Sequence, residues 1–208
     1  MSPKSISNKL LRYVIVGRSI TLICMRLFIG IPLASIVIDE LTKLTASLRA
    51  KDGHLRWSPP ETWHVTLQFL GSTDQQQYNC LIPRLREIYL PRIPIRLEST
   101  GIFDRAEIFY VDVKPAPALL VLQQAVLDAT TPCGFAPESR PYHPHITLAR
   151  AKDKEATSAL DRLKSRSDRD PKFTLFMADE FVLYESFTLP TGSRYEIRER
   201  FPLGHSNG

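Results

Sequence analysis

The chain has 208 residues, 43% hydrophobic and 24% charged, which suits one sizeable globular domain or two closely packed lobes. A formal net charge of +5 is a mild excess that favours an anionic ligand, but no long Lys/Arg block is present that could wrap duplex nucleic acid. The three cysteines are odd in number and form no CxxC pair. This argues against a disulfide framework and a cysteine zinc site, and we expect reduced thiols.

Residues 1–24 are expected to be an extension, disordered or not native, in front of a single domain at 25–208. Their apolar stretch is interrupted by Arg18 and is followed by no small-x-small cleavage site, so a signal peptide is not indicated. The stretch is also too short and too charged to cross a bilayer. We expect Met25 to be the true start, a cytoplasmic location and no membrane association.

The first half of the chain predicts the order strand–helix–strand–helix–strand. Residues 26–31 form a short apolar run with strand character. The helix after it is predicted from apolar residues on one helical face: Val37, Leu41, Leu44 and Leu48. A strand begins near His64. A second helix is expected at about 74–90, where Pro83 would kink or break it. A strand at 93–99 closes this half.

The second half predicts the same order after a crossover at 101–105. One helix is again indicated by a face of apolar residues: Leu119, Leu122, Val126 and Ala129. The other expected elements are strands at 107–113, from His145, at 173–184 and, as a short piece, at 195–198, with a helix at about 153–165.

An internal repeat relates the two halves. The sequences HVTL from His64 and HITL from His145 are offset by 145 − 64 = 81 residues, and the flanking elements follow the same offset. We therefore expect an α+β protein with two pseudo-symmetric lobes, each an antiparallel sheet with helices on its outer face, and an active-site cleft between them. Neither half is expected to be an independent domain.

Each His-x-Thr sequence predicts a strand with one polar and one apolar face. Residues two apart in a strand share a face, so His64, Thr66 and Gln68 are expected together, with Leu67 and Phe69 in the core. The second copy repeats this pattern. One isolated His-x-Thr is most often structural, but two copies in phase indicate a joint site.

Two histidines in one cleft can perform acid–base chemistry on a phosphodiester. Histidine titrates near neutral pH, so one copy can accept a proton while the other donates one. Threonine hydroxyls can meet the charge that develops on phosphoryl oxygens. We also weighed a metal site at His64, His143 and His145, but no acidic residue lies at ligand spacing, and we expect no metal.

Five segments, in order, resemble the 2H phosphoesterase superfamily, and in particular the RNA 2′,3′-cyclic phosphodiesterases known as LigT-type 2′-5′ RNA ligases. The resemblance covers 25 to about 202. The segments are MRLFIGIPL, HVTLQFLGSTD, TGIF, RPYHPHITLAR and FVLYESFTLPTGSRYEI.

The resemblance implies a role for each site residue. His64 would be the general acid that protonates the leaving 3′ oxygen, and His145 the general base that activates water. Thr66 and Thr147 would bind the phosphate, and Arg150 would contact a substrate phosphate. Arg150 lies five residues after His145, on the opposite face of an ideal strand, so it reaches the site only if the strand ends or twists. An exposed strand-end charge is the alternative.

The resemblance implies hydrolysis of RNA 2′,3′-cyclic phosphate ends to 2′-phosphomonoesters without metal or cofactor, and 2′-5′ ligation as the reverse reaction. The partner would be an RNA end, for example on a tRNA fragment, bound by a monomer. Phe28, Phe69 and Tyr195 could stack a base. The alternatives are a phosphodiesterase of a small cyclic or 2′-5′-linked nucleotide, and a non-catalytic RNA-binding module.

Overall fold

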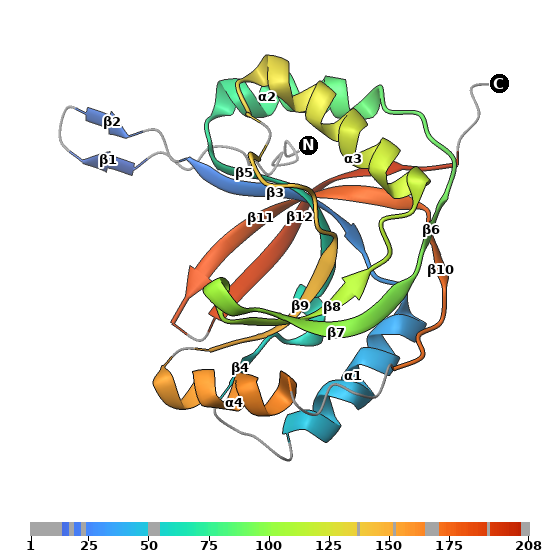
Figure 1. Cartoon of the computed structure of the whole chain (residues 1–208). Coiled ribbons are helices and arrows are strands. Elements are labelled where there is room, and N and C mark those ends of the chain that lie inside the picture. The colour runs from blue at the N-terminus through green and yellow to red at the C-terminus, as the bar shows by residue number, and fades with distance from the viewer. Residues whose placement is uncertain are drawn as a thin grey trace, which may run out of the picture.

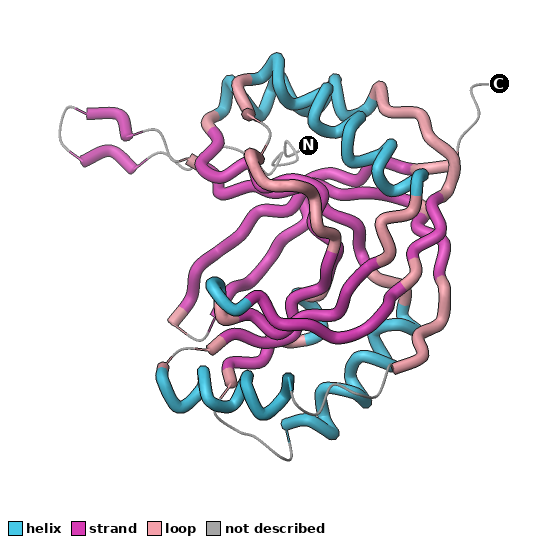
Figure 2. Tube along the Cα trace, viewed as in Figure 1, coloured by secondary structure: helices cyan, strands magenta, loops and turns pink. Residues whose placement is uncertain are grey.

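The fold, in a computed structural model, consists of two strand layers with helices on their outer sides (Figure 1). The structure describes residues 14–16, 19–21, 24–49, 55–136, 138–151, 153–164, 171–190 and 192–204. No helix in these ranges is long and apolar enough to cross a membrane. Figure 2 shows the strands gathered between an upper and a lower pair of helices, as expected for two lobes.

Two four-stranded antiparallel sheets form the lobes. The first has the order β12 (Gly192–Pro202), β11 (Glu180–Leu189), β3 (Met25–Pro32), β5 (His64–Thr73). The second has the order β4 (Arg56–Trp57), β9 (His145–Arg150), β8 (Ile108–Val113), β7 (Leu97–Phe103). Two-stranded sheets are formed by β6 (Ile93–Ile95) with β10 (Phe176–Ala178) and by β1 (Val14–Val16) with β2 (Ser19–Thr21). The antiparallel two-lobed α+β prediction is confirmed.

Each sheet is covered by one helix from each half of the chain (Figure 1). The first carries α2 (Gln75–Arg86) and α3 (Pro117–Thr130), and the second carries α1 (Ser35–Arg49) and α4 (Lys154–Lys164). Helices α1 and α3 are therefore exchanged between the halves. The Arg49 guanidinium of α1 lies 5.4 Å from the centre of the Trp57 ring in β4. The Thr130 hydroxyl of α3 donates a 2.8 Å hydrogen bond to Gln68 of β5.

The predicted apolar helix faces are the ones that pack into the core. Val37, Leu41, Leu119, Leu122 and Val126 are all fully buried in one continuous cluster. Burial of each such side chain stabilises the fold by about 1.5–3 kcal/mol.

Helix α2 begins at a capping box and continues through its proline. The Asp74 side chain accepts from the Gln77 amide, and the Gln77 side chain accepts from the Asp74 amide. Pro83 lies inside the helix, which ends at Arg86, so the expected break at Pro83 and the extension to 90 are wrong.

The predicted crossover at 101–105 is also wrong. Gly101 lies within β7, and a short 3₁₀ turn, η2 (Asp104–Ala106), connects β7 to β8 as a hairpin. A Cβ atom at Gly101 would lie 2.5 Å from the Tyr110 ring, so the glycine allows that ring to cross the backbone. The chain passes between the lobes at several other points, among them before α1 and before α3.

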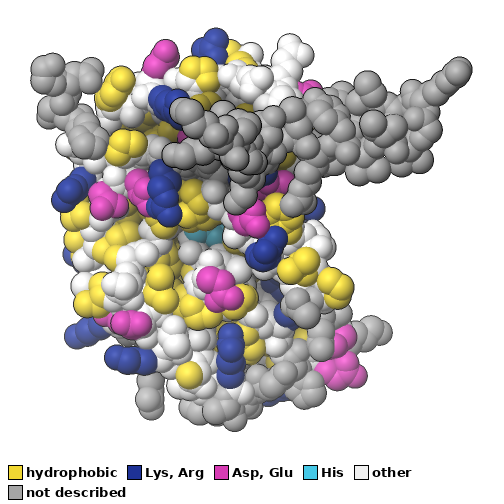
Figure 3. Space-filling model, turned by 180° about the vertical axis from the view of Figure 1, so that it is seen from behind, with side chains coloured by type: hydrophobic (Ala, Val, Ile, Leu, Met, Phe, Trp, Pro, Cys, Tyr) yellow, Lys and Arg dark blue, Asp and Glu magenta, His cyan; other side chains and the backbone are white. Residues whose placement is uncertain are grey.

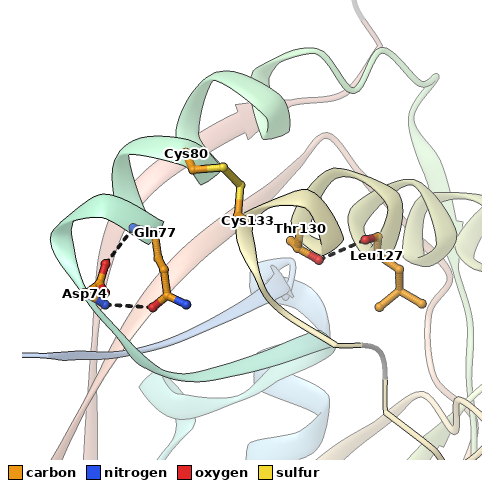
Figure 4. The surroundings of a disulfide bond; sticks show 6 residues. All are labelled: Asp74, Gln77, Cys80, Leu127, Thr130 and Cys133. Atoms are coloured by element: carbon orange, nitrogen blue, oxygen red, sulfur yellow. Dashed lines mark hydrogen bonds between the residues drawn. A yellow bond between two sulfur atoms is a disulfide. The ribbon is translucent and has the colours of Figure 1, made fainter.

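Cys80 of α2 and Cys133 form a disulfide with a Cα–Cα distance of 5.7 Å (Figure 4). Cys133 ends the 3₁₀ turn η3 (Thr131–Cys133), which directly follows α3. The expectation of three reduced thiols is wrong, because an odd count excludes only complete pairing: Cys24 is the remaining free cysteine. The disulfide joins two helices from different halves across 53 residues of chain.

Removal of this disulfide is expected to destabilise the protein. Cross-links of this loop length stabilise by about 2–4 kcal/mol, mainly by restricting the unfolded chain. A Cys80→Ala/Cys133→Ala variant, or the parent in dithiothreitol, should therefore unfold at lower urea concentration in equilibrium denaturation. The matched control is Cys24→Ser, which removes an exposed free thiol. Equal midpoints for parent and double variant under oxidising conditions would contradict the cross-link.

Candidate active site

His64 and His145 are the first residues of β5 and β9, and both line one cleft of about 1720 Å³. Thr66, Thr147 and Arg150 line the same cleft. In the space-filling view, a histidine side chain is visible in a hollow near the centre of one face, surrounded by hydrophobic side chains (Figure 3). The structure thus brings together all five residues expected from the sequence.

The two imidazoles are anchored in the same way. Nδ1 of His64 lies 2.8 Å from the carbonyl oxygen of Thr62, and Nδ1 of His145 lies 2.8 Å from that of His143. A carbonyl can only accept, so each Nδ1 carries hydrogen, and Nε2 is the nitrogen left for proton transfer. Nε2 of His64 is 3.1 Å from the Thr66 hydroxyl. The repeat therefore places two like-oriented bases in one cleft.

Both motif strands contain a bulge at the same place in the repeat. In β9, Thr147 pairs with Tyr110 and Ala149 with Phe109, so the pairing with β8 skips Leu148. In β5, the pairing with β3 skips Leu67, the position 81 residues earlier. Each bulge inserts one residue and reverses the alternation of faces beyond it.

The bulges decide which side chains face the cleft. Arg150 is exposed and lines the cleft, on the side of His145 and Thr147, whereas Leu148 and Ala149 are both buried. The bulge turns Arg150 towards the cleft, and Arg150 is also the last residue of β9, so the strand ends there, which was one of the two conditions set from the sequence. Phe69 occupies the equivalent position in β5.

Two predictions about the first motif are wrong for the same reason. Phe69 is 58% exposed and lines the cleft instead of the core. Gln68 is buried, and its side-chain oxygen accepts from Thr130. The period-two rule misplaced both because the skipped residue, Leu67, precedes them.

Aromatic rings surround each histidine. The His64 ring lies 4.7 Å from Phe28, 5.5 Å from Tyr184 and 5.4 Å from Tyr195. A Cβ atom at Gly30 would lie 2.9 Å from the Val65 carbonyl oxygen and 3.3 Å from the His64 ring, so glycine is needed for this close fit.

The second imidazole has a smaller aromatic surround. The His145 ring lies 4.8 Å from Phe103 and 5.5 Å from Tyr110, and these two rings stack at 4.0 Å. Of the base-stacking candidates Phe28, Phe69 and Tyr195, the last two line the cleft, and Phe28 and Tyr195 also contact His64. The contacts of Phe103 and Tyr110 with His145 were not anticipated from the sequence.

Burial keeps both imidazoles neutral in the free protein. It lowers the pKa of His64 from 6.5 to about 4, against the opposing hydrogen bond to Thr62, and the positive potentials of His145 and Arg150 lower it further. Burial also lowers the pKa of His145, opposed by its hydrogen bond to the His143 carbonyl. A bound anion would oppose this effect, because its negative charge would hold a proton on either ring.

One hydrogen bond connects the two motif strands. The Tyr142 hydroxyl, from the segment before the second motif, donates to the Thr66 carbonyl oxygen at 2.9 Å. His143, which we weighed as a metal ligand, instead contacts Asp112 at 2.6 Å. Among the described residues, no group of three or more His, Cys, Asp or Glu side chains is arranged to hold a metal ion.

Comparison with known proteins assigns the chain to a family. The model of the 2′-5′ RNA ligase superfamily matches residues 32–186. A Bacillus subtilis protein named RNA 2′,3′-cyclic phosphodiesterase is 30% identical over 185 residues, 85% of this chain and 95% of that protein. A Geobacillus stearothermophilus protein of the same name is 29% identical over 181 residues, again 85% of this chain but 56% of that protein, so the chain spans little more than half its length.

A solved structure shows the same fold. The crystal structure of Escherichia coli LigT complexed with 3′-AMP superposes with a TM-score of 0.73 at 24% identity, over 88% of this chain and 99% of that chain. Because the family model covers most of the two lobes and both His-x-Thr strands, the chain belongs to the 2′-5′ RNA ligase superfamily.

Proposed function

We propose that the protein hydrolyses 2′,3′-cyclic phosphate ends of RNA to 2′-phosphomonoesters, with His64 and His145 as a metal-independent acid–base pair. The observation that carries the proposal is the arrangement of two imidazoles in one cleft, each held through Nδ1 so that Nε2 is free for proton transfer. The activity named for the relatives in Bacillus subtilis and Geobacillus stearothermophilus supports it.

The reaction needs one proton taken and one given. His145 accepts a proton from water as its oxygen attacks phosphorus, and the P–O3′ bond breaks. His64 donates its proton to the departing 3′ oxygen, which leaves the phosphate on the 2′ oxygen. Thr66, Thr147 and Arg150 donate hydrogen bonds to the phosphoryl oxygens as their charge increases.

The role of general acid requires His64 to be protonated when the substrate is bound. Its pKa of about 4 in the free protein means that it is neutral at pH 7 and cannot yet act as an acid. The bound phosphate supplies the negative charge that raises its pKa. His145, also lowered by burial, is already in the neutral form that a base needs.

The cleft is better matched to an RNA end than to one small nucleotide. Its volume of about 1720 Å³ exceeds the roughly 300–1000 Å³ of pockets for single small molecules. The described lining residues include arginines and carboxylates in equal number, so charge alone does not separate the candidates. Exposed Phe69 offers a face for the terminal base, opposite Arg150 for a phosphate.

Further properties follow from the same proposal. The reverse reaction, 2′-5′ ligation, would use the same two proton transfers in the opposite direction. Both motifs come from one chain, so a monomer contains the whole site. We propose RNA ends such as those of tRNA fragments as substrates, encountered in the cytoplasm.

Substitution of either histidine tests the chemistry. His64→Gln and His145→Gln should each lower kcat for an RNA with a 2′,3′-cyclic end by about 10²–10⁴-fold, because each removes one proton transfer. The measurement is product formation in EDTA, with an unchanged melting temperature as the control for folding. Full activity of either variant, or loss of parent activity in EDTA, would overturn the mechanism.

Anion binding should be coupled to protonation of His64. Because its free pKa is about 4, sulfate binding at pH 6 should draw a proton onto the ring, and affinity should rise as the pH falls from 7 towards 5. Calorimetry in two buffers of different ionisation enthalpy measures the proton uptake. It should be smaller in His64→Gln. Sulfate binding without proton uptake in the parent would contradict this coupling.

Base stacking on Phe69 predicts a binding defect. Stacking contributes about 1–3 kcal/mol per base, so Phe69→Ala should raise KM for a cyclic-ended oligonucleotide about 10-fold or more, and Phe69→Trp should not. Tyr89→Ala is the matched control, because Tyr89 is equally exposed (59%) and does not line the cleft. An unchanged KM for Phe69→Ala would exclude the stacking role.

A further inference from the structure

His143 is the one described cleft histidine that the acid–base mechanism leaves unused. It precedes the second motif, and its side chain is about half exposed at the cleft. Its Nε2 lies 2.6 Å from Oδ1 of Asp112, a carboxylate that is itself only partly exposed. This distance is at the short end for a hydrogen bond between an imidazole and a carboxylate, as expected when a partner is charged.

Both members of the His143–Asp112 pair adjoin His145. The His143 carbonyl accepts the hydrogen bond from Nδ1 of His145. Asp112 lies directly opposite His145 in the β8–β9 register. The Phe103 ring stands edge-on to both imidazoles, 5.0 Å from His143 and 4.8 Å from His145. His143 thus binds the β8 carboxylate that lies opposite His145 in the register.

The first motif has the carbonyl but lacks the pair. Thr62 supplies the carbonyl for His64, and its own hydroxyl donates to Pro59. The residue opposite His64 in the register is Pro32, where the second motif has Asp112. The second motif thus has a carboxylate opposite its imidazole and a further side chain that binds this carboxylate. The first motif has a proline at the equivalent position.

Charges around His145 act in both directions. Asp112 of β8 raises its pKa, whereas His143 and Arg150 lower it. His64 faces it from β5, and the Tyr110 phenol, itself close to Asp104, faces it from β8. An Asp112 carboxylate released from His143 would be free to pair with His145 and hold a proton there. A protonated His145 could not activate water.

We propose that His143 is a positioning residue for His145: its imidazole occupies the Asp112 carboxylate, so that His145 stays a neutral general base at neutral pH. The inference rests on the proposed function for the role of His145 as base. The contacts of the pair are independent of that role.

The pH dependence of kcat, which reports the substrate complex in which the bound phosphate keeps His64 protonated, tests the proposal. His143→Ala frees Asp112 and should move the acid limb, which reports loss of the base by protonation, to higher pH by about one unit. His143→Arg can still pair with Asp112 and should keep the parent limb. The double variant His143→Ala/Asp112→Asn removes the released carboxylate and should return the acid limb to its position in the parent. The control is Glu138→Gln, which removes one negative charge, as Asp112→Asn does, but in the loop that precedes the second motif.

A measurement without turnover separates this proposal from the proposed function. The His145 pKa, followed by NMR in the free protein, should rise in His143→Ala and return in the double variant. If the parent has no cyclic phosphodiesterase activity but the NMR shifts occur, the proposed function fails and the pairing stands. If His143→Ala lowers kcat without moving the limb or the NMR titration, the positioning role is excluded.

Discussion

The one-residue bulge in each motif strand is the constraint on which the cleft depends. In a regular strand, Arg150 would lie on the buried face with Ile146 and Leu148. The skipped pairing at Leu148 reverses the alternation, and the skipped pairing at Leu67 does so in β5. One local irregularity, present twice, therefore presents a cation and an aromatic ring to the same cleft, and Gln68 is buried at its edge with its oxygen bonded to Thr130.

The two pseudo-symmetric halves form the scaffold of the cleft, and the positions at which they differ make its two sides unequal. Both imidazoles have the same tether, so backbone geometry alone does not distinguish acid from base. The halves differ where Phe69 stands for Arg150 and where Pro32 stands for Asp112. An exposed aromatic ring on one side and charged groups on the other make the two sides of the cleft chemically different.

Local patterns predicted most of the fold and the residues that meet in the cleft. Helical faces, the repeat and the two His-x-Thr strands depend on neighbours within one turn or one strand, so the sequence alone reveals them. The bulges, the exchange of helices and the Cys80–Cys133 disulfide depend on contacts between distant segments. Sequence periodicity carries no information about such contacts. Phe69 and Gln68 were therefore misplaced, whereas His64 and His145 were found.

The exchange of α1 and α3 has a mechanical consequence. Each sheet is covered by a helix whose flanking strands belong to the other sheet, and the chain passes between the lobes repeatedly. Hinge closure needs a few linker residues that absorb a rotation, and this topology offers no such single joint. Tyr142 and the β6–β10 ribbon further restrain relative motion. The cleft is thus preformed, and adaptation to different ligands falls to side-chain rotamers and the loops at its rim.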